Sequence, residues 1–180
     1  PALTARDLLE NVHGPLFALA MHAWMRIAGE SEWALRVLPA LGGTLMVPAM
    51  ALLADRWLGR SAVAPAAWLT AGSPFLVWYS QEARGYAWLM LFSTLAAAAL
   101  LELRRRCDLG RVMVYLLASA AALWSNLSFA LLIPLHLQWW LGGDEATRPQ
   151  RRRWLIAASL IGVLVAAPWI PQIIRTWDWQ

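Results

Sequence analysis

The chain has 180 residues, of which 60% are hydrophobic and only 14% are charged. Soluble domains carry about a quarter charged residues, so the composition excludes an ordinary soluble domain and predicts a polytopic membrane protein. The basic residues are all arginine and give a formal net charge of +4. They lie in short loops between apolar runs rather than on one face, so no nucleic-acid partner is expected. The single cysteine, Cys107, excludes an internal disulfide framework and a cysteine-based metal site.

Residues 1–36 are predicted to form an outer loop that contains one helix, over about residues 15–28. Pro15 suits the first turn of that helix, where a missing N–H does no harm. The stretch is too short to cross a hydrocarbon core about 30 Å thick. Its polar residues His22 and Arg26 are four apart and share one face. These features favour an amphipathic, juxtamembrane helix that lies along the membrane surface.

Uncharged runs predict a multi-spanning, all-α helical bundle with about six membrane spans. The predicted spans cover residues 37–55, 61–80, 86–103, 112–124, 127–141 and 154–174, with the charged residues Asp55 and Glu102 at or next to span ends. Residues 112–143 could instead form one long crossing, and this choice decides where the arginine-rich loops at 104–111 and 148–153 lie. Two crossings with a break at 124–126 put all these loops on one side, which the positive-inside rule favours and identifies as the cytoplasm. The surface helix, the loop after residue 80 and the turn at Asn126 then face the extracytoplasmic side.

An acid and a base interrupt the apolar sequence at this extracytoplasmic edge. Glu82 and Arg84 lie between two uncharged runs, with Gln81 and Tyr86 beside them. Ionisable groups at a membrane boundary are costly and usually serve a function. The carboxylate could act as a base or hold a hydroxyl group or a divalent cation, and the guanidinium could bind a phosphate in bidentate fashion. The alternative is an interfacial loop in which Glu82 and Arg84 neutralise each other and the tyrosines form an aromatic belt.

One further side chain is a candidate for the same surface. His13 opens a His-Gly-Pro-Leu turn and could donate to a phosphate or ligate a metal, although a lone histidine is more often an interfacial polar group. No pair of histidines stands at i, i+4 with a carboxylate, and no phosphate loop, dinucleotide fingerprint or Gly-x-Ser-x-Gly elbow occurs. The sequence therefore names no metal ligand beyond Glu82, and the metal requirement stays open.

Four stretches together carry a family resemblance. They are the His-Gly-Pro-Leu-Phe turn from His13, residues 29–41, the Ser-Pro-Phe at 73–75, and Tyr-Ser-Gln-Glu-Ala-Arg-Gly-Tyr at 79–86. Over roughly residues 11–130 the chain resembles the GT-C class of polyprenyl-phosphate-dependent glycosyltransferases. Within that class it is similar to the family 39/83-like branch, which includes protein O-mannosyltransferases and the lipid A aminoarabinose transferase.

The resemblance implies that residues 1–180 are part of one transmembrane glycosyltransferase domain in a bacterial inner membrane. Such enzymes move a sugar, with inversion, from a polyprenyl-phosphate carrier to an extracytoplasmic lipid, glycan or protein. Matching positions would make Glu82 the second acidic site residue and Arg84 a contact to the carrier phosphate. Gln81, Tyr86 and His13 would line the substrate site, beside membrane lipids.

The chain departs from the family pattern in two ways. Relatives carry a catalytic acidic motif a few dozen residues before the histidine turn, and Asp7 and Glu10 are too close to His13 for that role. Gly14 also replaces the first proline of the usual His-Pro-Pro. We therefore expect a fragment that lacks its principal base.

Two alternative functions stay open at this stage. A transporter or flippase would place ionisable residues inside the spans, whereas here they lie almost only at span ends. A non-catalytic membrane scaffold would use Glu82 and Arg84 only as an interfacial ion pair, worth about 1 kcal/mol or less.

Overall fold

A computed structural model describes residues 14–141 together with residues 152, 153, 162 and 167. This part of the chain is helical and contains no β-strand. Its elements are α2 (Pro15–Ala28), α3 (Glu32–Leu58), α4 (Val63–Ala71), α5 (Pro74–Gln81), α6 (Tyr86–Arg105), α7 (Leu109–Ser125) and α8 (Ile133–Leu141), with short 3-10 helices at Arg60–Ala62 and Leu127–Leu132. The predicted all-α class is therefore confirmed for the described residues.

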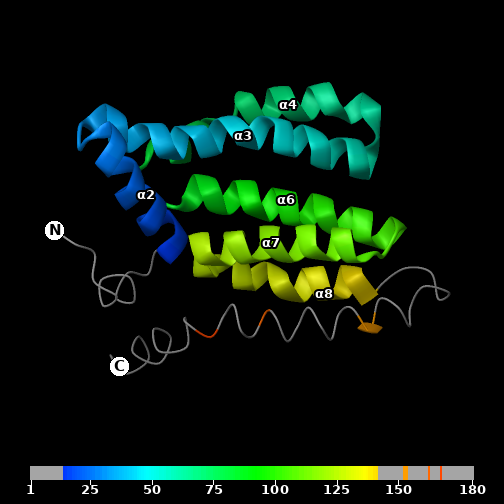
Figure 1. Cartoon of the computed structure of the whole chain (residues 1–180). Coiled ribbons are helices and arrows are strands. Elements are labelled where there is room, and N and C mark those ends of the chain that lie inside the picture. The colour runs from blue at the N-terminus through cyan, green and yellow to red at the C-terminus, as the bar shows by residue number, and fades with distance from the viewer. Residues whose placement is uncertain (1–13, 142–151, 154–161, 163–166, 168–180) are drawn as a thin grey trace, which may run out of the picture.

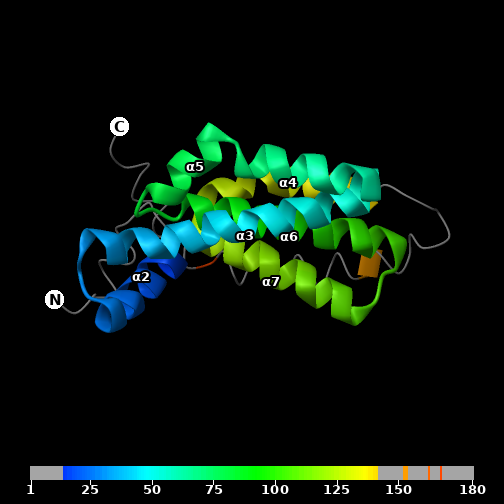
Figure 2. The same cartoon turned by 90° about the horizontal axis from the view of Figure 1, so that it is seen from above.

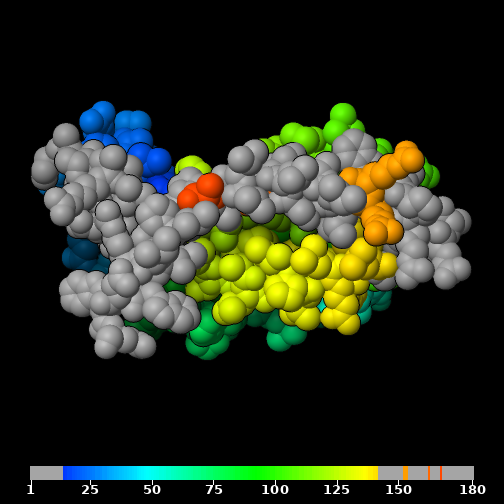
Figure 3. Space-filling view, turned by 90° about the horizontal axis from the view of Figure 1, so that it is seen from below, coloured from blue at the N-terminus to red at the C-terminus, as the bar shows by residue number. Residues whose placement is uncertain are grey.

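The long helices lie side by side in layers. α6 packs between α3 and α7, and α8 also packs against α6 (Figure 1). α4 and α5 cover α3 on the side away from α7 (Figure 2). The residues of Leu127–Leu132 and α8, coloured yellow, form a continuous part of the opposite face (Figure 3). Leu131 and Leu135 are exposed on this segment, as expected of a surface that faces lipid or further helices.

The helix predicted at 15–28 is confirmed as α2, with the same bounds. Pro15 occupies its first turn, and Gly29, at φ 81°, ends it. α2 lies obliquely across one end of the bundle (Figure 1). Phe17 and Met21 are buried and pack with Leu38 of α3, so α2 is anchored through its apolar face. Its orientation relative to a membrane stays a prediction.

Two of the described helices are long and apolar enough to cross a membrane. α3 has 27 residues and contains the predicted span 37–55, but it begins earlier, at Glu32, because the Ser31 hydroxyl caps it by accepting from the Ala34 N–H at 3.2 Å. α6 has 20 residues and confirms a helix at 86–103. The other apolar helices, Leu109–Ser125 and Leu127–Leu141, are shorter. The count of about six spans therefore stays a prediction.

The second predicted span, at 61–80, is wrong as one continuous helix. The chain forms α4, breaks at Gly72 and Ser73, and resumes as α5. Pro74 causes the break, because a proline disfavours helical conformation in the residue before it. Ser73 is extended, at φ −72° and ψ 114°, and its hydroxyl accepts from the Leu76 N–H at 3.4 Å. Both halves still pack along α3, so the segment returns along that helix in two pieces (Figure 2).

The division of the long uncharged run is confirmed. α7 ends at Ser125, and Asn126 is extended, with its side-chain oxygen accepting from the Ser128 N–H at 2.9 Å. The next segment, predicted at 127–141, begins as a 3-10 helix and continues as α8. The predicted span at 154–174 lies outside the described residues.

Small residues let the helices approach closely around the loop that joins α5 to α6. A Cβ atom on Gly43 of α3 would lie 2.3 Å from the Cβ of Ser80, near the end of α5. A Cβ on Gly42 would just touch Ala87, at the start of α6, at 3.4 Å. α3 therefore holds both flanks of this loop against its own backbone.

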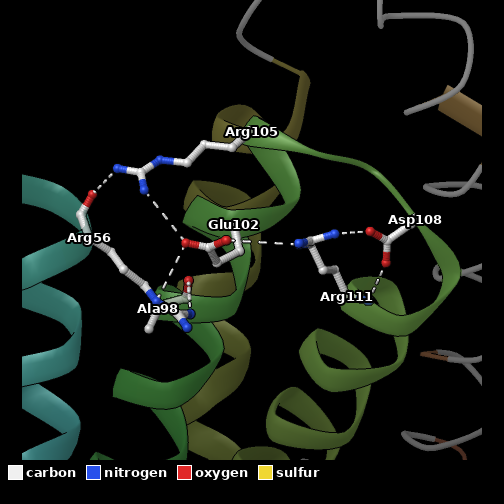
Figure 4. A network of polar contacts seen from close by, with 6 residues as sticks. All are labelled: Arg56, Ala98, Glu102, Arg105, Asp108 and Arg111. Atoms are coloured by element: carbon white, nitrogen blue, oxygen red, sulfur yellow. Dashed lines mark hydrogen bonds and ion pairs between the residues drawn. The ribbon is translucent and has the colours of Figure 1, made fainter.

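The other end of α6 carries a cluster of arginines around one carboxylate (Figure 4). Glu102 pairs with Arg56 Nε at 3.5 Å, Arg105 Nη1 at 3.6 Å and Arg111 Nε at 3.8 Å. Arg56 also donates to the Ala98 carbonyl at 3.2 Å, and Arg105 donates to the Arg56 carbonyl at 2.7 Å. We refer to this group as the Glu102 cluster. It joins α3, α6 and α7 at the end where the sequence places its arginine-rich loops.

We expect Gly43→Ala to lower the free energy of unfolding by about 1–3 kcal/mol, because the added methyl group cannot fit against Ser80. The loss should appear although alanine is the better helix former by about 1 kcal/mol. Unfolding of the purified protein in mixed micelles, followed by tryptophan fluorescence, measures the change. Gly110→Ala is the matched control, since its Cβ would meet only an Asp108 oxygen at 3.4 Å. Equal stability of Gly43→Ala and the wild type would contradict the close α3–α5 approach.

Candidate functional site

Glu82 stands at the end of α5, where the backbone leaves the helix. Its φ of −78° and ψ of 130° are those of extended chain, and the residue is half-buried. The Trp78 indole N–H, one helical turn earlier, donates to Glu82 Oε1 at 3.1 Å. A hydrogen bond of this kind fixes the direction in which the carboxylate points. The structure thus holds the Glu82 carboxylate with a partner that the sequence analysis did not identify.

Arg84 points its charge away from the packed core. The residue is exposed, and its backbone N–H donates to the Glu82 carbonyl at 2.7 Å in a tight turn. No ion pair or hydrogen bond joins the Arg84 guanidinium to another described residue, Glu82 included. The alternative in which Glu82 and Arg84 neutralise each other in a direct ion pair is therefore not what the structure forms.

Aromatic rings brace the loop from both sides. Tyr79 of α5 and Tyr86 of α6 meet edge-on with ring centroids 5.1 Å apart, and Phe75 contacts Tyr79 at 4.7 Å. Tyr86 is half-buried by these contacts. The ring pair ties the last turn of α5 to the first turn of α6, which limits how far the intervening residues can move.

The loop lies where three chain segments meet. A Cβ on Gly85 would be 2.7 Å from the Ser125 carbonyl oxygen and 3.3 Å from the Phe17 Cβ. Gly14, just before α2, donates its N–H to the same Ser125 carbonyl at 3.2 Å. The start of α2, the α5–α6 loop and the turn at Asn126 therefore share one end of the bundle, as the sequence predicts. His13, the remaining predicted site residue, lies outside the described residues.

A cleft opens beside this loop, between α3 and α5. It has a volume of about 430 Å³ and is lined by Ser80 and Gln81 from α5 and by Glu32, Arg36 and Trp33 from α3. Gln81 is exposed at its edge. Glu32 and Arg36 form an ion pair at 2.5 Å across one helical turn. The sequence analysis missed both residues, because their approach to Gln81 depends on how α3 packs against α5.

Within the part of the chain that the structure describes, no three His, Cys, Asp or Glu side chains gather in a group that could hold a metal ion. Glu82 by itself offers one carboxylate, fewer ligands than Mg²⁺ or Ca²⁺ requires. The described residues therefore do not make up a divalent-cation site, and no step is assigned to such an ion.

Comparison with known proteins gives the wider context of this loop. A family model described as dolichyl-phosphate-mannose-protein mannosyltransferase matches residues 12–171. The chain belongs to this family. Searches of curated proteins and of solved structures gave no match. Membership makes the protein a membrane glycosyltransferase of the mannosyltransferase kind, and the match includes α2, the Glu82–Arg84 loop and the Asn126 turn.

Only part of the site around Glu82 could be predicted from the sequence. Glu82, Arg84, Gln81 and Tyr86 are neighbours in sequence, so their proximity was expected. Trp78 precedes Glu82 by four residues, and the one-turn spacing of a helix was a signal that could have identified it. The convergence of Gly14, Gly85 and Ser125 had no comparable local signal.

Proposed function

We propose that this family member transfers a sugar from a polyprenyl-phosphate carrier to an acceptor at the extracytoplasmic membrane face, with inversion at the anomeric carbon. The observation that carries the proposal is the exposed Arg84 guanidinium, without a partner among the described residues, beside the half-buried Glu82 carboxylate. An exposed guanidinium without a partner among the described residues, at the end of a helical bundle, suits an anionic group presented by the bilayer.

Arg84 is proposed to contact the carrier phosphate. In a direct displacement the acceptor oxygen forms a bond to the anomeric carbon while the bond from that carbon to the phosphate oxygen breaks. The acceptor hydroxyl gives its proton to the principal base, which would be the acidic motif that relatives carry before the histidine turn. Negative charge develops on the departing polyprenyl phosphate. A guanidinium held at this position would stabilise that charge in the transition state more than in the ground state, which is what accelerates the reaction.

Glu82 is proposed to orient the acceptor hydroxyl. Its Oε1 already accepts from Trp78 at 3.1 Å, which leaves the other carboxylate oxygen available as an acceptor for a substrate O–H. Gln81 and Tyr86 would line the edge of the same site, and His13 would approach the donor from the turn before α2. A fixed carboxylate contributes through orientation, which is a large part of the barrier reduction in two-substrate reactions.

The cleft between α3 and α5 is proposed as the polar wall beside the transferred sugar. Gln81 offers an amide, and Glu32 and Arg36 offer a paired carboxylate and guanidinium along its sides. Sugar hydroxyls are recognised by such planar polar groups, which can donate and accept together.

Loss of the charge of either Arg84 or Glu82 should reduce sugar transfer without unfolding the protein. Removing one group that stabilises developing charge lowers kcat by about 10²–10³-fold, and we expect an effect of this size for Arg84→Ala and a smaller one for Glu82→Gln. The assay follows a radiolabelled sugar from polyprenyl phosphate into membrane acceptors. Arg106→Ala, which removes an exposed arginine at the opposite end of α6, should keep the wild-type rate. Wild-type transfer by Arg84→Ala would disprove the assigned role.

The extracytoplasmic placement can be tested with thiols at the two ends of α6. In a Cys107→Ser background, Arg84→Cys and Arg106→Cys each place one thiol in an exposed loop. A membrane-impermeant maleimide added to intact cells should label the first variant, and should label the second only after the membrane is permeabilised. Labelling of both from outside, or of Arg106→Cys alone, would reverse or abolish the proposed sidedness.

A further inference from the structure

The end of the bundle that holds the Glu102 cluster carries more positive charge than its own carboxylates neutralise. Residues 55–60 and 102–111 contain six arginines and three carboxylates, which leaves a formal net charge of +3. Glu102 is shared by Arg56, Arg105 and Arg111, and Asp108 pairs with Arg111 (Figure 4). Because two carboxylates do not neutralise three guanidinium groups, this end retains attraction for an added anion.

A cleft opens directly into this cluster. It has a volume of about 280 Å³ and is lined by Arg56 of α3, Glu102 of α6, and Asp108, Gly110 and Arg111 at the start of α7. The side chains of Arg56 and Arg111 are 28% and 35% exposed, so both guanidinium groups are held by the protein yet still reach the opening.

Both arginines keep donors to spare. Arg56 hydrogen-bonds through Nη1 to Ala98, and Arg111 through Nη1 to Asp108. The Nη2 group of neither arginine donates a hydrogen bond within residues 14–141. A guanidinium offers five N–H donors in a planar fork that fits two oxygens of one phosphate. The two arginines could therefore bind a phosphate without leaving Glu102.

The surroundings of the cleft favour a lipid over a free anion. Val114, which lines the cleft, and Leu117, about one turn further along α7, are 58% and 65% exposed. Trp57 meets Trp139 edge-on at 5.6 Å, and the Arg104 guanidinium lies 5.0 Å above the Trp139 ring. Tryptophan and arginine at one level along a bundle are typical of the membrane–water interface. A ligand with an anionic head and apolar chains would match both the cleft and its exposed apolar rim.

We propose that the cleft between Arg56 and Arg111 binds the phosphodiester headgroup of an anionic phospholipid, with the acyl chains along the exposed surface of α7 at Val114 and Leu117. Basic pockets between membrane helices bind such headgroups through the same combination of charge and apolar contact. The site is at the opposite end of α6 from Glu82 and Arg84, and the proposal does not depend on the transfer reaction. A lipid here would tie α3 to α7 across α6.

Native mass spectrometry of the 180-residue chain, released from detergent, tests the site with phosphatidylglycerol and phosphatidylcholine of identical acyl chains. Each arginine near an anionic headgroup contributes about fivefold in affinity, so phosphatidylglycerol should bind at least about fivefold more tightly. Arg111→Gln should reduce this preference by about fivefold. Arg26→Gln, the same change of charge at an exposed arginine in the last turn of α2, should leave it unchanged.

A second variant separates binding from folding. Gly110→Leu keeps every charge and places a better helix former at the start of α7. Because Gly110 lines the cleft, the leucine side chain would occupy part of the cleft volume. It should fold as well as the wild type and lose the preference for phosphatidylglycerol. Equal binding of the two lipids by the wild type, or an unchanged preference in Gly110→Leu, would overturn the proposal. Competition by glycerol phosphate at the concentrations at which the lipid binds would also overturn it, in favour of a free anion.

Discussion

The position of the loop between α5 and α6 depends on small residues that let neighbouring backbones approach closely. Gly43 allows Ser80 to pack directly on α3, and Gly85 lies against the Ser125 carbonyl, where a Cβ would be 2.7 Å away. In a membrane, helices gain little from burying apolar side chains against one another, so contacts between small residues carry much of the association. The loop between α5 and α6 is therefore fixed by packing at both flanks, although it is short and polar.

The charged side chains at the two ends of α6 differ in whether they have ion-pair partners, and the proposed function depends on this difference. At one end, Glu102 draws three arginines into a network that joins α3, α6 and α7. At the other, Arg84 has no described partner, and Glu82 is held only by the Trp78 indole. The Glu102 cluster uses its charges to join helices and keeps a partial excess of positive charge, whereas the Arg84 guanidinium has no partner among the described residues. The proposed contact between Arg84 and a carrier phosphate rests on that difference, in a chain that belongs to a mannosyltransferase family.

The sequence predicted elements whose signals are local. Pro15 and Gly29 bound α2, and Asn126 marks the break after α7, because capping and turn chemistry act within a few residues. The prediction of one continuous helix at 61–80 was wrong for a local reason. Pro74 interrupts the helix, but it leaves the segment apolar and uncharged, so a hydropathy pattern does not reveal the break. The α3–α5 cleft with Glu32 and Arg36 could not be predicted, because it arises only when residues more than 40 positions apart pack together. The contact of Trp78 with Glu82 could be predicted from their spacing of four residues, but only once α5 was known to extend to Gln81.

Photo-crosslinking tests the central claim, that the Glu82–Arg84 loop receives the carrier phosphate, most directly. A photoreactive residue placed at Ala83, which is exposed between the two charged side chains, leaves both of them intact. The matched position is Leu69 of α4, which is 76% exposed and lines neither of the two proposed sites. The account predicts that radiolabelled polyprenyl phosphate crosslinks at position 83 and not at 69, and that unlabelled polyprenyl phosphate, but not phosphatidylcholine, competes. Equal crosslinking at the two positions, or crosslinking at 69 alone, would contradict it.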